Sequence, residues 1–177
     1  PHCNFQLRGA EGDRDEQFVR KLASKYNKTV LVRKFDTEAY AKEKKISVQV
    51  AARELRYNWF FSLLDAHEAD LVLTAHHRDD NIETLLMNFF KGTGIAGLRG
   101  ILPKQNKLVR PLLFASRADL QAYAEARDLQ WVEDSSNASD KYARNYLRHQ
   151  LVPVLQELYP QVSENLAANI QRFRDIE

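Results

Sequence analysis

One short apolar run constrains the fold of this chain more than any other segment. Residues 71–75 (Leu-Val-Leu-Thr-Ala) carry no charge and lie between two helical patterns. Such a run is typical of a central parallel strand that is buried on both faces. The helical pattern before it begins at Ser47 and ends near Glu68, and the pattern after it follows His76 and His77.

Strand and helix patterns alternate along the rest of the chain. We expect a helix over 13–26, opened by Asp13 and Glu16 as a capping box, and then a strand over 29–35. The helix after His77 should end at Lys91-Gly92 and be followed by an apolar stretch over 108–114. A helix capped by Ser116 and Asp119, a strand over 130–132 and helices from 141 onward complete the order. This alternation predicts an α/β fold with a mainly parallel, Rossmann-like sheet flanked by helices and a helical C-terminal extension. Ligands of such folds bind beyond the carboxyl ends of the strands.

Composition limits the classes of partner. The 177 residues are 44% apolar, which suffices for one full core. Lys and Arg number 26 against 24 acidic residues, so the net charge of +2 creates no strong field, and any polyanion site must be a local cluster. Cys3 is the only cysteine, which excludes an internal disulfide and fits a reducing, cytoplasmic setting. No run approaches the roughly 18 apolar residues of a membrane span, so we expect no membrane association.

Titratable side chains gather where the central strand meets the next helix. His76, Asp79, Asp80 and Glu83 lie there, beside backbone amides that suit a phosphate. The carboxylates, with Asp80 as the candidate ligand, could hold Mg²⁺ that bridges phosphate oxygens. Two other interpretations stay open. Asp80 and Glu83 have the spacing of a capping box, and a histidine with aspartates could hold a metal ion that activates water.

Three further patterns are weaker. Lys141, Arg144 and Arg148 share one helical face and could follow a phosphate backbone, although a solvated face explains them equally well. Arg53 and Arg56 lie three residues apart on another helix. Residues 92–97 match the dinucleotide fingerprint letter by letter but follow a helix rather than a strand, so they indicate a flexible loop that could close over a substrate.

Together these segments resemble one family, the tRNA(Ile)-lysidine synthetases of the PP-loop ATP-pyrophosphatase superfamily. The resemblance rests on the order and spacing of residues 2–9 with 13–15, 51–57, 75–84, 92–98, 110–113, and 134–137 leading to Arg144, Asn145 and Arg148. It implies an adenine nucleotide alpha hydrolase-like fold, with a catalytic domain over 1–155 and a helical linker over 156–177.

The resemblance also implies an activity. Such enzymes use ATP to adenylate the wobble cytidine of a tRNA(Ile) whose anticodon is CAU, and L-lysine then replaces the activated oxygen to give lysidine. His76, Asp80 and Glu83 would line the reaction centre. Arg53, Arg56, Asp79 and Asn137 would bind ATP or substrate, and Lys141, Arg144 and Arg148 would bind tRNA. Mg²⁺ would accompany ATP, and a homodimer is common among such proteins.

One motif of the family does not occur here. The Ser-Gly-Gly-x-Asp-Ser loop that holds pyrophosphate is missing from these residues, so we expect a fragment of the catalytic domain with negligible ATP turnover by itself. Two alternatives remain. One is a related cytidine thiolase, which the single Cys3 disfavours because such enzymes usually carry paired cysteines. The other is a non-catalytic tRNA-binding module.

Overall fold

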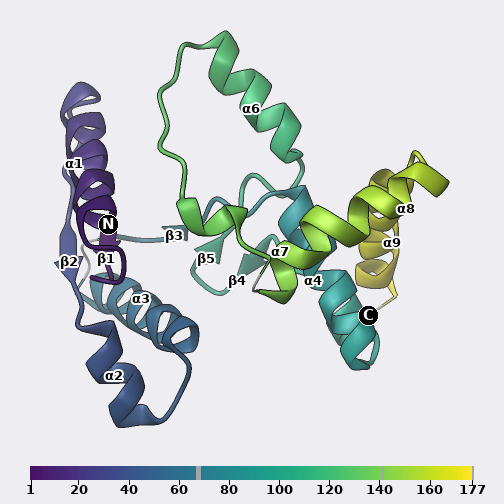
Figure 1. Cartoon of the computed structure of the whole chain (residues 1–177), viewed down its shortest axis with the longest axis horizontal. Coiled ribbons are helices and arrows are strands. Elements are labelled where there is room, and N and C mark those ends of the chain that lie inside the picture. Colours follow the sequence, from purple (N-terminus) through teal and green to yellow (C-terminus); the bar gives the residue numbers. More distant parts are fainter. Residues whose placement is uncertain (67–68, 141, 177) are drawn as a thin grey trace. The chain divides into compact units, whose positions relative to one another are not determined.

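Helices make up most of the chain, and its strands are short (Figure 1). The computed structural model describes residues 1–66, 69–140 and 142–176. The chain divides into two units, Pro1–Val72 and Leu73–Glu177. Within the described residues, no helix is both long enough and apolar enough to cross a membrane.

The first unit combines a pair of parallel strands with helices. Strand β1 (His2–Asn4) pairs with β2 (Val32–Lys34) in parallel register. The helices of this unit are α1 (Ala10–Lys25), α2 (Thr37–Lys44) and α3 (Val48–Asp65). The predicted long helix from Ser47 is confirmed as α3, and the Ser47 hydroxyl caps it by accepting the Val50 amide at 3.3 Å.

Aromatic side chains form the core of this unit. The ring of Phe35 stacks on Phe5 with 5.8 Å between centroids and meets the edge of Trp59 at 6.1 Å. Phe35 and Trp59 are each 8% exposed. Burial of such a side chain stabilises a fold by roughly 1.5–3 kcal/mol. The strand before Phe35 and the helix that carries Trp59 are therefore joined through their apolar faces.

The start of α1 differs from the prediction. The helix begins at Ala10, after Gly9, and not at Asp13. Asp13 and Glu16 instead accept hydrogen bonds from the side-chain amide of Asn4, at 3.2 and 3.1 Å. Asn4 is 5% exposed, and a buried amide needs hydrogen-bond partners. The contact with Asn4 thus engages the Asp13 and Glu16 carboxylates, which the local sequence pattern predicted as a helix cap.

The strands of the second unit correct the predicted sheet. Strand β3 (Val72–Leu73) lies at the edge of a sheet with the order β3-β5-β4, and β4 (Lys104–Gln105) is antiparallel to β5 (Leu108–Val109). The run over 71–75 therefore forms a strand only at Val72–Leu73, and that strand is not central. Within the described residues the extended parallel sheet is not formed, and Gln130–Val132 adopt no strand.

Helix α4 (Arg78–Lys91) organises the second unit. It packs against α5 (Ile95–Leu98), α7 (Ala143–Tyr146) and α9 (Val162–Asp175). Its apolar side chains Ile82, Leu85 and Leu86 are buried, at 3%, 4% and 6% exposure. The spacing of these residues is the helical pattern seen in the sequence, which explains why this helix is predictable.

The remaining helices connect these elements. Helix α6 (Arg117–Ala126) begins at the predicted capping box, in which the Asp119 amide donates to Ser116 Oγ at 3.0 Å and the Ser116 amide to Asp119 Oδ2 at 2.8 Å. A π-helix over Leu147–Leu151 joins α7 to α8 (Val152–Leu158). Pro153 cannot donate to the carbonyl four residues before it, and the wider π-turn precedes this proline.

The glycine-rich loop after α4 is held in place rather than free. Two asparagines of α4 bind its backbone: Asn88 Nδ2 donates to the Gly97 carbonyl at 2.8 Å, and Asn81 Oδ1 accepts the Ile101 amide at 2.6 Å. Asn81 is 6% exposed. The sequence pattern could not show these contacts, because both asparagines lie within the helix and not within the loop.

Gly100→Ala is expected to lower the free energy of unfolding by about 1–3 kcal/mol. Gly100 has a φ of 61°, and an added Cβ would lie 2.1 Å from Asn81 Oδ1, the atom that accepts the Ile101 amide. Gly94→Ala is the matched control, since its φ is −78° and nothing lies within 4 Å of an added Cβ. Urea unfolding measures both variants, and equal midpoints would contradict this account of the loop.

Candidate active site around the first turn of α4

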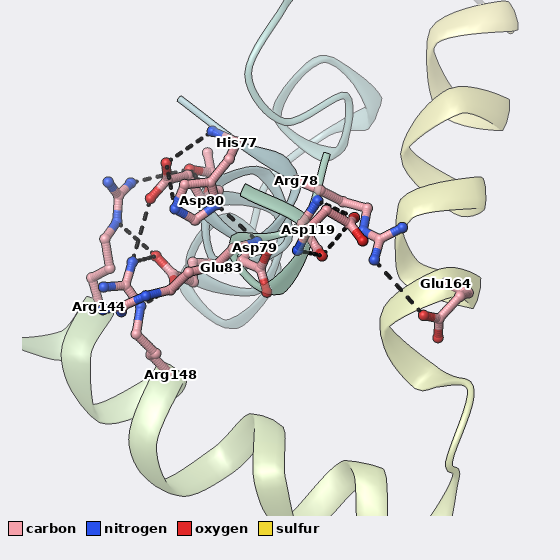
Figure 2. Close-up of polar contacts among 12 residues, drawn as sticks. His77, Arg78, Asp79, Asp80, Glu83, Asp119, Arg144, Arg148 and Glu164 are labelled. Atoms are coloured by element: carbon pink, nitrogen blue, oxygen red, sulfur yellow. Dashed lines mark hydrogen bonds and ion pairs between the residues drawn. The ribbon is translucent and has the colours of Figure 1, made fainter. Parts of the chain in front are cut away.

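Two adjacent carboxylates lie at the start of α4 (Figure 2). Asp80 Oδ2 accepts the backbone amide of His77 at 3.1 Å, and Asp79 Oδ2 accepts the amide of Arg117 at 2.8 Å. Arg117 is the first residue of α6, so the Asp79 carboxylate links the start of α4 to the start of α6. Amides at a helix start carry partial positive charge and stabilise nearby anions.

Glu83 lies one turn further along α4 and is 2% exposed. Arg148 Nε donates to Glu83 Oε1 at 2.7 Å and Arg148 Nη2 to Glu83 Oε2 at 3.1 Å, which is a bidentate ion pair. Arg144 Nε lies 3.5 Å from Glu83 Oε2, and its Nη2 donates to Thr84 Oγ1 at 3.1 Å. Burial raises the pKa of Glu83, and the hydrogen bonds and charge of Arg148 oppose that rise.

The predicted basic stripe therefore faces carboxylates. Arg148 Nη2 also lies 3.4 Å from Asp80 Oδ1, so this guanidinium contacts two acids of α4 (Figure 2). Arg144 keeps 40% of its side chain exposed, whereas Arg148 keeps 19%. Lys141, the third predicted member, lies outside the described residues. The structure thus brings Asp80, Glu83, Arg144 and Arg148 together in one cluster.

The two histidines before α4 have different partners. His76 Nδ1 forms a hydrogen bond with Thr74 Oγ1 at 2.8 Å. The ring of His77 instead lies beside both aspartates, with Nδ1 3.5 Å from Asp79 Oδ2 and Nε2 3.5 Å from Asp80 Oδ2. His76 is the histidine that the sequence predicts for the site, and the contact of His77 with the aspartates was not predicted. The position of His77 directly before the helix, three residues from Asp80, was the available signal.

The ring of His77 and the Arg117 amide lower the pKa of Asp79 from 3.8 to about 2. Asp79 is thus a carboxylate at neutral pH. Because its folded-state pKa lies below the unfolded value, the stability that it contributes is present above the unfolded pKa and is lost as pH falls through the folded pKa.

Asp79→Asn is therefore expected to destabilise the protein at pH 7, and the difference from the native chain should shrink as pH falls from about 4 toward about 2. Urea unfolding at several pH values measures it. Asp128→Asn is the control, because Asp128 is exposed and has a left-handed φ of 51° that asparagine also tolerates. A pH-independent effect of Asp79→Asn would refute the assignment.

The other predicted ligand-binding residues have their described contacts outside this cluster. Arg53 and Arg56 belong to the first unit, where their guanidinium groups lie 4.9 Å from the Tyr57 ring and 5.1 Å from the Phe5 ring. Asn137 lies in a short 3-10 turn over Ser135–Ala138, and its amide donates to the Asp134 carbonyl at 3.0 Å. Their contacts with ATP or substrate remain a prediction.

A cavity of about 240 Å³ adjoins the acidic cluster. Asp79, Glu83, Arg148, Gln156 and Ser163 contribute to its lining. This volume is below the roughly 300–1,000 Å³ of sites for drug-sized ligands. The cavity therefore suits a small polar group better than a whole nucleotide.

The described residues contain no group of three or more His, Cys, Asp or Glu side chains that could hold a metal ion. Mg²⁺ at a nucleotide site needs fewer protein ligands, because one or two carboxylates and the substrate phosphates usually suffice. Asp79 and Asp80 fit that limited role, since they are adjacent carboxylates at a helix start.

Comparison with known proteins places this fold in a class. Residues 2–155 match the family model described as a PP-loop domain. The chain belongs to the PP-loop domain family, which confirms the expected fold in general terms. The solved U34-tRNA thiolase NcsA from Methanococcus maripaludis shares that fold, with a TM-score of 0.76 over 99% of this chain and 62% of the thiolase chain. The sequence identity is 16%, so this likeness concerns the fold alone.

More specific similarity comes from proteins named tRNA(Ile)-lysidine synthase. The protein of Bacteroides thetaiotaomicron is 45% identical over 175 residues, and that of Chlorobaculum tepidum is 38% identical over 174 residues. These matches cover 99% and 98% of this chain. The chain spans 41% and 52% of the length of those two relatives.

Proposed function

We propose that the intact protein converts the wobble cytidine of a CAU-anticodon tRNA(Ile) to lysidine. The observation that carries this proposal is the 45% identity, over 99% of this chain, to a protein named tRNA(Ile)-lysidine synthase. Membership of the PP-loop domain family supports ATP as the activating substrate. Residues 1–155 would supply catalytic-domain elements, and 156–177 would lead toward further domains.

The chemistry has two steps. The oxygen on carbon 2 of cytosine attacks the α-phosphate of ATP, and pyrophosphate leaves. The ε-amine of L-lysine then attacks carbon 2, the bond from that carbon to the adenylated oxygen breaks, AMP leaves, and the amine loses its proton. Adenylation is needed because the free oxygen is a poor leaving group.

The acidic cluster at the start of α4 would serve the second step. Asp79, a carboxylate at neutral pH, and its neighbour Asp80 would attract the ammonium groups of lysine or hold Mg²⁺, which neutralises phosphate charge when bound. His76 would stabilise charge that develops on the base. Glu83 would act within this centre through its contact with Arg148, which fixes the orientation of its carboxylate.

Arg144 and Arg148 differ in how far they are available to bind RNA. Arg148 is committed to Glu83 and Asp80, whereas Arg144, 40% exposed, retains surface that an RNA phosphate could reach. Arg53, Arg56 and Asn137 would contribute to ATP or substrate binding. These roles rest on the resemblance of their segments to the family.

Transfer of isotope-labelled lysine to tRNA tests the proposal. The full-length protein is incubated with ATP, Mg²⁺, labelled L-lysine and a tRNA(Ile) transcript with a CAU anticodon. A transcript that carries uridine at the wobble position is the matched control. We expect ATP-dependent label only on the cytidine transcript. Equal labelling of both transcripts, or of neither, would contradict the proposal.

A further inference from the structure

A second cavity, of about 620 Å³, opens on another face of α4. Arg78 and Asn81 line it, and their spacing of three residues places them on one side of the helix. Asp80 and Glu83 have the same spacing but are offset by two residues, so they lie on the opposite side. In Figure 2, Arg78 points away from Asp80 and Glu83. The second cavity and the acidic cluster thus share the first turns of one helix.

The lining of this cavity is cationic. Arg78, Lys104, Arg110 and Arg174 contribute to it, and none of the described residues that line it is acidic. Exposed Glu164 lies 3.9 Å from Arg78 Nη2 and offsets part of that charge. The cavity therefore has the charge complementary to phosphate.

The individual cations are held in different ways. Arg174 donates to the carbonyls of Arg99 and Ile101, at 3.2 and 2.7 Å, and no described carboxylate lies within ion-pair distance of it. Lys104 is exposed, and the described part of the chain provides it with no carboxylate partner. Arg174 is thus fixed by neutral acceptors, and Lys104 is free to contact a ligand.

An aromatic side chain completes the surface. Phe114 lines the cavity and is 78% exposed, the highest exposure among the large apolar side chains that the structure describes. Single-stranded RNA is recognised by stacking of bases on such rings, while nearby Lys and Arg side chains bind its phosphates.

We propose that this cavity binds the single-stranded anticodon loop, with a base stacked on Phe114 and the adjoining phosphates at Lys104 and Arg78. The proposal rests on the proposed function for the identity of the RNA. The cavity would add cations for RNA phosphates to the exposed Arg144, because Arg148 is engaged by carboxylates. An RNA held in the cavity would reach the start of α4 from the side opposite Glu83.

The test measures binding of a fluorescent anticodon stem-loop RNA with a CAU loop to the full-length protein, without ATP or lysine. Lys104→Glu is expected to weaken binding about tenfold and to reduce the slope of log affinity against log salt by about 1. Phe114→Ala is expected to weaken binding by at least about fivefold without changing that slope, because stacking carries no net charge.

Matched controls exist for both changes. Lys107→Glu makes the same charge change in the same β4–β5 hairpin but outside the cavity, and should alter affinity by no more than about twofold. Phe90→Ala removes a ring that is 62% exposed and lies outside the cavity lining. Thermal unfolding midpoints equal to that of the native protein show that each variant is folded.

Each outcome decides the proposal. Native RNA affinity in both Lys104→Glu and Phe114→Ala would overturn it, and so would loss of ATP binding with unchanged RNA binding, which would indicate a nucleotide pocket. The assay involves no turnover. If both variants lose RNA but the native protein forms no lysidine, the RNA site stands and the proposed reaction fails. If lysidine forms and both variants bind normally, the RNA site alone fails.

Discussion

Arg148→Ala is expected to lower the free energy of unfolding by about 3–5 kcal/mol. The change would leave Glu83, 2% exposed, as a buried carboxylate without its bidentate partner. Because burial already raises the pKa of Glu83, its charge opposes folding once Arg148 is removed, and the loss should be largest above that pKa. Urea unfolding at neutral pH measures the effect.

Two further variants make this prediction specific. Arg144→Ala should cost less than about 1 kcal/mol, because Arg144 is 40% exposed and lies 3.5 Å from the same carboxylate. The double variant Glu83→Leu/Arg148→Met should recover most of the stability, since apolar residues of similar volume often replace a buried ion pair without loss. If Arg148→Ala keeps native stability but loses tRNA affinity, Arg148 is an RNA ligand and not a support of Glu83.

Asp80→Asn is expected to reduce lysidine formation by about 100-fold or more, the range found when a group that assists proton transfer or charge stabilisation is lost. Asparagine keeps an oxygen that can accept the His77 amide, so α4 should remain capped and stable. Single-turnover assays of lysidine formation, with the melting temperature as a check on folding, measure the effect.

His76→Ala should show a comparable loss of product. His77→Asn is its control, because asparagine is a favoured residue before a helix, and product formation should fall by less than about tenfold. The two histidines are adjacent but have different partners, Thr74 for His76 and the aspartates for His77. If only His77→Asn abolishes the product, the catalytic histidine was assigned to the wrong position.

The sequence predicted helices best, because their signals are local. The apolar spacing of Ile82, Leu85 and Leu86 and the Ser116–Asp119 capping box each involve residues within one or two turns. Helix α2 was missed although Asp36 accepts the Ala39 amide at its start, because eight residues give little periodicity. The prediction of a strand over 130–132 was wrong, and Trp131 in this segment is 48% exposed.

The candidate site was predictable in its members but not in its contacts. The gathering of His76, Asp79, Asp80 and Glu83 is visible in the sequence, since they follow one strand directly. The ion pair between Glu83 and Arg148 joins residues 65 positions apart, so it depends on the packing of α4 with the C-terminal helices. The basic residues on one helical face therefore predicted a cationic cluster correctly, but they did not show which carboxylates would pair with it.

Nucleoside mass spectrometry shows whether the intact protein forms lysidine. The full-length protein is incubated with ATP, Mg²⁺, L-lysine and a CAU-anticodon tRNA(Ile), and the digested nucleosides are analysed. We expect a lysine adduct on cytidine together with release of pyrophosphate and AMP. A sulfur-containing cytidine formed with a sulfur donor present, or tight tRNA binding with unchanged cytidine, would contradict it.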